Sequence, residues 1–102
     1  MKLWIDDVRQ PPAGCGYRWI KSVNEAKLTI QHLEDGMLYE PIEVIDMDHD
    51  AGDYAKFGGD YIKLLDWLEE TRRDYPIHIH SMNPVGVENM RRIIKRNGWI
   101  EV

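Results

Sequence analysis

The sequence predicts an α/β protein, a three-layer sandwich around a parallel sheet of four to five strands. Short apolar segments alternate with segments whose apolar residues recur at helical spacing, a pattern typical of parallel strands joined by crossover helices. Acidic residues or histidines directly follow several of the apolar segments. The carboxyl ends of parallel strands meet at one edge of a sheet, so we expect these polar residues to form one site.

Length and composition indicate one globular domain over residues 1–102, with a hydrophobic share of 43%. The net charge of −5 disfavours a nucleic-acid duplex or an anionic membrane as a partner, and no apolar segment is long enough to span a bilayer. The single Cys15 permits no intrachain disulfide, which favours a reducing, cytoplasmic location.

Apolar and β-branched residues define the strands, and Pro and Gly define the loops between them. The loop 8–16 contains Pro11, Pro12, Gly14 and Gly16, which together exclude a helix after the first strand. Gly58 and Gly59 close a second loop, 51–59, whose Tyr54 and Phe57 could stack on a base or cover the core. The predicted strands cover residues 2–6, 17–21, 43–48 and 77–81, and a last edge strand covers residues 99–102.

Three helices are predicted from capping residues and apolar stripes. Ser22 and Glu25 have the spacing of a capping box, which starts a helix over 22–33. Asp60 is expected to cap a second helix, and Asn83 followed by Pro84 starts a third that ends at Asn97-Gly98. The expected buried stripes are Ala26, Ile30 and Leu33; Ile62, Leu65 and Leu68; and Val87, Met90, Ile93 and Ile94.

The segment 43–50 carries the densest group of polar residues. Asp46, Asp48 and Asp50 share one face for as long as the strand continues, and His49 lies between the last two. Carboxylates packed this closely repel each other, so such a group holds a hard cation or a proton. A turn at the strand end is the alternative, because Asp residues bond to their own backbone there.

A second group of candidates follows the fourth strand. His78 and His80 alternate along it and lie about 6.6 Å apart on one face, with His80 nearer to the acidic residues. His80 is therefore the candidate acid or base, whereas His78 lines the same pocket or is a buried core histidine. Asn83 is expected to cap the next helix, and the free N–H groups of that helix start could alternatively bind a phosphate. Arg9 is placed to contact a substrate phosphate.

These residues resemble the receiver domain of two-component signalling. Asp6 and Asp7 match its magnesium-binding acidic pair, and Asp48 matches the aspartate that accepts a phosphoryl group. Asp50 matches the position two residues later that helps to hold the metal, and Ser81 falls near its small hydroxyl residue. In contrast to a receiver, the first helix is lost and the C-terminal part is reduced, with no lysine in 99–102 and with histidines that have no counterpart.

The combined motifs Leu-Trp-Ile-Asp-Asp-Val-Arg, Asp-His-Asp and His-Ile-His-Ser-Met-Asn-Pro-Val-Gly resemble the cyclic-phosphate-processing receiver-like family of bacteria and their phages. This resemblance implies a metal-dependent phosphoesterase that acts on a cyclic phosphate of an RNA end or a phosphorylated small molecule, with magnesium or manganese as the metal. The alternative is a non-catalytic receiver-like module that binds a nucleotide, phosphate or protein. The expected catalytic residues are His80, Asp48 and His49; the substrate-binding residues Arg9, His78, Ser81 and Asn83; and the metal ligands Asp6, Asp7, Asp48 and Asp50.

Overall fold

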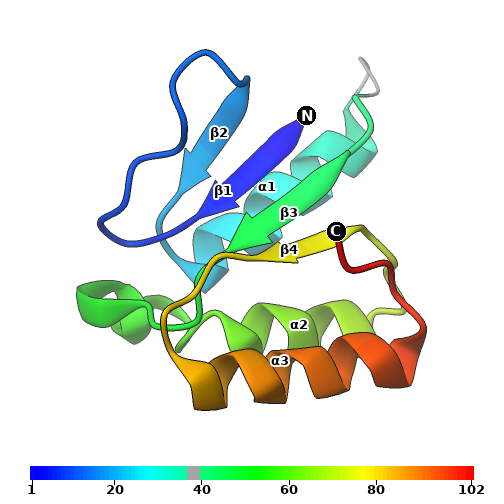
Figure 1. The fold of residues 1–102 in the computed structure, drawn as a ribbon. Coiled ribbons are helices and arrows are strands. Elements are labelled where there is room, and N and C mark those ends of the chain that lie inside the picture. Colours follow the sequence, from blue (N-terminus) through cyan, green and yellow to red (C-terminus); the bar gives the residue numbers. More distant parts are fainter. Residues whose placement is uncertain (37–39) are drawn as a thin grey trace.

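A computed structural model describes residues 1–36 and 40–102 of the chain (Figure 1). Its four strands pair in parallel in the order β2-β1-β3-β4. The strand that leads to Asp48 therefore lies between those that lead to Asp7 and His80, as the sequence predicts. Residues 37–39 of the predicted connection 37–42 lie outside the described residues. The strands are β1 (Lys2–Ile5), β2 (Tyr17–Ile20), β3 (Val44–Met47) and β4 (Ile77–Ile79).

Each face of the sheet has its own chemistry, because side chains alternate along a strand. One face is apolar and forms the core with α1 (Val23–Asp35), α2 (Ile62–Glu70) and α3 (Pro84–Asn97). This parallel sheet with three helices confirms a small receiver-like α/β fold. The fully buried strand residues of this face are Leu3, Ile5, Ile20, Ile45, Met47 and Ile77.

The opposite face presents polar and aromatic side chains, among them Trp4 and Asp46. The segment after β1 lies over this face: the Trp4 indole donates a hydrogen bond to the Arg9 carbonyl oxygen at 2.8 Å. Trp4 is only 6% exposed as a result. The outer layer here is therefore a loop, because the Pro- and Gly-rich segment 8–16 replaces a helix, as its composition predicts.

Capping residues fix two of the three helix starts. The Ser22 hydroxyl accepts a hydrogen bond from the Glu25 N–H at 3.0 Å, and the Glu25 carboxylate accepts one from the Lys21 N–H at 2.8 Å. The Asn83 side chain likewise accepts a hydrogen bond from the Gly86 N–H at 3.0 Å. Satisfying these free N–H groups stabilises each first turn by about 1 kcal/mol.

Three expectations for the second half of the chain are corrected. Asp60 does not cap α2: its carboxylate accepts a hydrogen bond from the Ala51 N–H at 2.9 Å, which ties the preceding loop to the helix start. The predicted loop 51–59 contains a short 3-10 helix, η1 (Gly52–Phe57). The expected edge strand 99–102 is reduced to one parallel bridge between Ile77 and Glu101. Of the helices in the described residues, none combines the length and the apolar character needed to cross a membrane.

Candidate functional site

Three carboxylates gather at the carboxyl ends of β1 and β3. Because these strands are neighbours in parallel register, Asp6 and Asp7 after β1 meet Asp48 after β3. One oxygen of each carboxylate lies within 4.8 Å of the others. A divalent cation with oxygen ligands at about 2.0–2.6 Å can contact oxygens at this spacing. We call this set of three residues the acidic cluster.

The protein environment shifts the pKa values of Asp6 and Asp7 in opposite directions. Burial opposes ionisation of Asp6, but hydrogen bonds from the Arg9 and Val8 N–H groups and from His80 outweigh it and lower the pKa of Asp6. For Asp7, burial and the neighbouring charges of Asp6 and Asp48 raise the pKa above its ordinary value. The cluster therefore concentrates negative charge that a cation would relieve.

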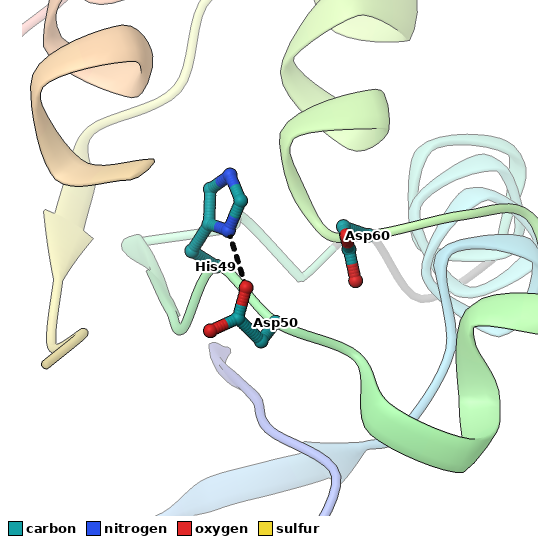
Figure 2. A group of neighbouring side chains, drawn as sticks. All are labelled: His49, Asp50 and Asp60. Atoms are coloured by element: carbon teal, nitrogen blue, oxygen red, sulfur yellow. Dashed lines mark hydrogen bonds and ion pairs between the residues drawn. The ribbon is translucent and has the colours of Figure 1, made fainter. Parts of the chain in front are cut away.

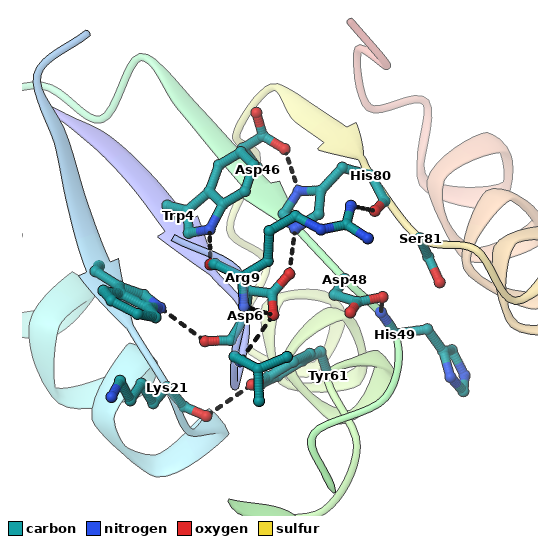
Figure 3. A network of polar contacts seen from close by, with 12 residues as sticks. Trp4, Asp6, Arg9, Lys21, Asp46, Asp48, His49, Tyr61, His80 and Ser81 are labelled. Atoms are coloured by element: carbon teal, nitrogen blue, oxygen red, sulfur yellow. Dashed lines mark hydrogen bonds and ion pairs between the residues drawn. The ribbon is translucent and has the colours of Figure 1, made fainter. Parts of the chain in front are cut away.

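His80 joins two of the strands through its imidazole (Figure 3). Its Nδ1 lies 2.5 Å from a carboxylate oxygen of Asp46, and its Nε2 lies 3.0 Å from an oxygen of Asp6. The ring stacks on Trp4 with a centroid distance of 3.9 Å, and the Tyr17 hydroxyl donates to the second oxygen of Asp46 at 3.0 Å. The side chain of His80 is only 10% exposed.

These contacts favour the protonated form of His80. Burial alone would lower the pKa of its imidazole, but the hydrogen bonds and charges of Asp46 and Asp6 outweigh burial and raise it above 6.5. An imidazolium between two carboxylates has both of its N–H groups occupied. In this arrangement the ring orients Asp6. A proton can leave the His80 ring only after one of its hydrogen bonds to a carboxylate breaks.

A second group of polar side chains lies beside the acidic cluster and consists of His49, Asp50 and Asp60 (Figure 2). The Nδ1 of His49 lies 2.7 Å from an oxygen of Asp50, and the Asn83 amide donates to the same carboxylate at 3.3 Å. The pair with His49, despite partial burial, lowers the pKa of Asp50. Among the described residues, no hydrogen bond reaches Nε2 of His49, so this nitrogen is available for proton transfer.

Gly86 in the first turn of α3 provides the space for the His49 ring. A Cβ atom at this position would lie 2.5 Å from Cγ of His49, well inside van der Waals contact. We therefore expect Gly86→Ala to displace the ring and to lower the free energy of unfolding by about 1–3 kcal/mol, the usual cost of overpacking. Chemical denaturation measures this change, and Asn89→Ala on the exposed side of α3 is the control. Equal stability of the two variants would contradict the close packing.

The structure separates several residues that the sequence brings together. Asp46, Asp48 and Asp50 contact three different sets of partners, because β3 ends at Met47 and the strand alternation ends with it. His78 is exposed rather than part of the core, and its Nδ1 lies 2.5 Å from the Val102 carbonyl oxygen.

The remaining predicted residues lie around the rim of the site. The guanidinium of Arg9 donates to the His80 carbonyl oxygen at 3.3 Å, which brings the loop 8–16 against β4. The Ser81 hydroxyl accepts a hydrogen bond from the Asn83 N–H at 3.1 Å, just before the start of α3. Asn83 both caps α3 and contacts Asp50, so the helix start adjoins the second polar group.

Sequence reasoning missed the aromatic residues that bond to the backbone around the site. The Trp19 indole donates to the Asp6 carbonyl oxygen at 2.8 Å, and the buried Tyr61 hydroxyl donates to the Lys21 carbonyl oxygen at 2.7 Å. Burial and the nearby carboxylates raise the pKa of Tyr61 strongly, so its hydroxyl stays protonated. The signal for the role of Trp4 and Trp19 was their alternation with apolar residues, which places them on the face of the sheet that the helices leave open.

The geometry now allows the chain to be classified. A receiver-like sheet with an acidic cluster at its carboxyl edge, and a histidine bound between two carboxylates, defines a modified receiver domain. The family model of the cyclic-phosphate processing receiver domain matches residues 1–96, and the chain belongs to this family. No curated protein and no solved structure matches the sequence significantly.

Proposed function

We propose that this protein is a metal-dependent phosphoesterase that opens a cyclic phosphate of an RNA end or of a nucleotide. The observation that carries the proposal is the acidic cluster, in which three carboxylates from two neighbouring strands converge. Membership of a cyclic-phosphate processing family supports the substrate class. Carboxylate oxygens are the donors that magnesium and manganese prefer, so the residues present fit such a cation.

The three residues of the acidic cluster would hold the cation, which when bound would polarise a phosphoryl oxygen and offset developing charge. His80 keeps the Asp6 carboxylate in place, because its Nε2 lies 3.0 Å from an oxygen of that carboxylate. Arg9 is exposed next to the cluster and carries a planar guanidinium suited to a phosphate. In this proposal Asp50 supports His49 rather than the cation, since its carboxylate bonds to that ring.

The proton for the departing oxygen would come from His49 rather than from His80. The first candidate, His80, has both ring nitrogens bound by carboxylates. The Nδ1 of His49 lies 2.7 Å from an oxygen of Asp50, which orients the ring, and among the described residues no hydrogen bond reaches its Nε2.

The test is hydrolysis of RNA that ends in a 2′,3′-cyclic phosphate, measured with manganese or magnesium present. We expect His49→Gln to lower the rate by about 10²–10⁴-fold, the usual effect of losing a general acid or base. His32→Gln is the matched control, because His32 lies exposed on α1. Equal rates in the two variants would remove the acid role from His49.

The wild-type rate itself separates the two functions that the sequence leaves open. Metal-dependent opening of the cyclic phosphate supports the phosphoesterase. A well-folded, metal-loaded wild type without activity would instead favour the receiver-like binding module. The variant Asn89→Ala, at an exposed position of α3, should stay folded and active. Such a result would show that a surface substitution on α3 does not by itself change the measured rate.

A further inference from the structure

A pocket of about 390 Å³ lies at the carboxyl end of β2. Its lining residues are Trp19, Lys21, Ser22, Glu25, Tyr54 and Phe57. Three of these six residues are aromatic, and Phe57 is 46% exposed although it is apolar. Sites for small ligands typically have volumes of about 300–1,000 Å³ and aromatic walls. We call this cavity the aromatic pocket.

The aromatic pocket and the acidic cluster share structural elements. The Trp19 indole in the pocket wall donates a hydrogen bond to the Asp6 carbonyl oxygen at 2.8 Å. On the opposite wall, η1 begins at Gly52, where a Cβ atom would lie 2.3 Å from an oxygen of Asp7, and it carries Tyr54 two residues later. Figure 3 shows Lys21 beside Tyr61 and below Asp6. If a ligand places its phosphate at the acidic cluster, the groups attached to that phosphate can therefore reach the aromatic pocket.

The charges in the pocket decide which kind of group fits. The Lys21 ammonium lies 4.5 Å from the centroid of the Trp19 ring and 5.9 Å from that of the Tyr54 ring. A second lysine, Lys56, lies over the Phe57 ring at 5.3 Å. Glu25 also lines the pocket, but its carboxylate accepts a hydrogen bond from the Lys21 N–H at 2.8 Å. Because the Lys21 ammonium already lies between the rings, a cationic ligand would be repelled. A flat, uncharged ring attached to an anionic group satisfies both the aromatic walls and the lysines.

We propose that the aromatic pocket binds the nucleobase of a nucleoside phosphate whose phosphate lies at the acidic cluster. This inference rests on the proposed function and narrows its substrate class, because a phosphorylated metabolite without a base would leave the pocket empty. Tyr54 and the half-exposed Phe57 supply the aromatic surface for the base, and Trp19, whose ring Lys21 covers at 4.5 Å, forms the inner wall of the pocket. Lys21 is then positioned between the base and the negatively charged phosphate.

The experiment measures equilibrium binding of two phosphomonoesters that contain no cyclic phosphate to open, adenosine 3′-monophosphate and glycerol 2-phosphate, with manganese present. We expect the wild type to bind the nucleotide about tenfold more tightly, in line with the contribution of one base stacked on an aromatic ring. Tyr54→Leu and Phe57→Leu should each reduce this preference and keep the affinity for glycerol 2-phosphate. Leu28→Ala, an exposed position on α1, should change neither affinity.

The inference would be overturned if the wild type bound the nucleotide no more tightly than glycerol 2-phosphate. It would also be overturned if both pocket variants kept the wild-type preference for the nucleotide. Because Phe57 is largely exposed, Phe57→Leu remains a valid test even if Tyr54→Leu unfolds the chain. A trinucleotide with a 3′-phosphate separates two sources of the same chemistry: tighter binding than the mononucleotide indicates an RNA end, and equal binding indicates a free nucleotide. Base-dependent binding without hydrolysis of a cyclic phosphate would support the pocket and refute the phosphoesterase.

Discussion

His80→Ala is expected to lower the free energy of unfolding by about 3–5 kcal/mol, which is the cost of leaving buried carboxylates without their cationic partner. In the wild type, the imidazole contacts Asp46 and Asp6, which are 5% and 1% exposed, and it covers the indole of Trp4. For a chain of this size, the melting temperature should fall by more than about 10 °C.

The pH dependence of this loss provides a second measurement. Because the folded state raises the pKa of His80, its contribution is complete below the ordinary value of 6.5 and is lost as the pH rises through the raised pKa. The difference in stability between wild type and His80→Ala, measured in a metal chelator, should therefore shrink as the pH rises above 6.5. His32→Ala is the control. A difference that is constant with pH would show that the ring acts only by packing.

Asp48→Asn is expected to abolish most of the stabilisation that a divalent cation gives the wild type. A ligand at 100 times its dissociation constant stabilises a folded protein by about 2.7 kcal/mol, which thermal unfolding resolves easily. Asparagine keeps the size of the side chain but removes one of the three charges in the acidic cluster. The measurement is the melting temperature with and without manganese or magnesium.

Asp53→Asn provides the matched control for this experiment. Asp53 is an exposed carboxylate in η1 that does not belong to the acidic cluster, so its substitution removes the same charge from the same region. The wild-type response to the metal should persist in Asp53→Asn. An unchanged response in Asp48→Asn as well would exclude Asp48 as a ligand.

Much of the fold follows from the sequence because its signals are local. Ser22 with Glu25 and Asn83 with Pro84 start helices by bonds to their own first turn, and the structure confirms both starts. The parallel order was predictable from the alternation of strands and helices. Asp60 was misassigned because an aspartate before a helix can bond equally well to a neighbouring loop, and here the Ala51 N–H is its partner.

The candidate site was predictable only in part, because its contacts join residues far apart in the chain. Parallel pairing alone brings Asp6 and Asp7 to Asp48, so sequence reasoning could place them at one edge. Asp50 is separate from these three residues because β3 ends at Met47, and sequence reasoning locates a strand end only to within one or two residues. The contacts of His80 depend on the side-chain directions at three strand ends, which no local pattern specifies.

The bridge through His80 also has a consequence for the order of folding events. It connects residue 80 to residues 34 and 74 positions earlier in the chain, and contacts of such sequence separation are slow to form. Helix caps and neighbouring turns can form first, whereas the acidic cluster is complete only when β1 and β3 have paired, and the His80 bridge forms only when β4 has joined them. A partly folded chain would therefore hold these three aspartates apart, so the site that we propose for the cation exists only in the paired sheet.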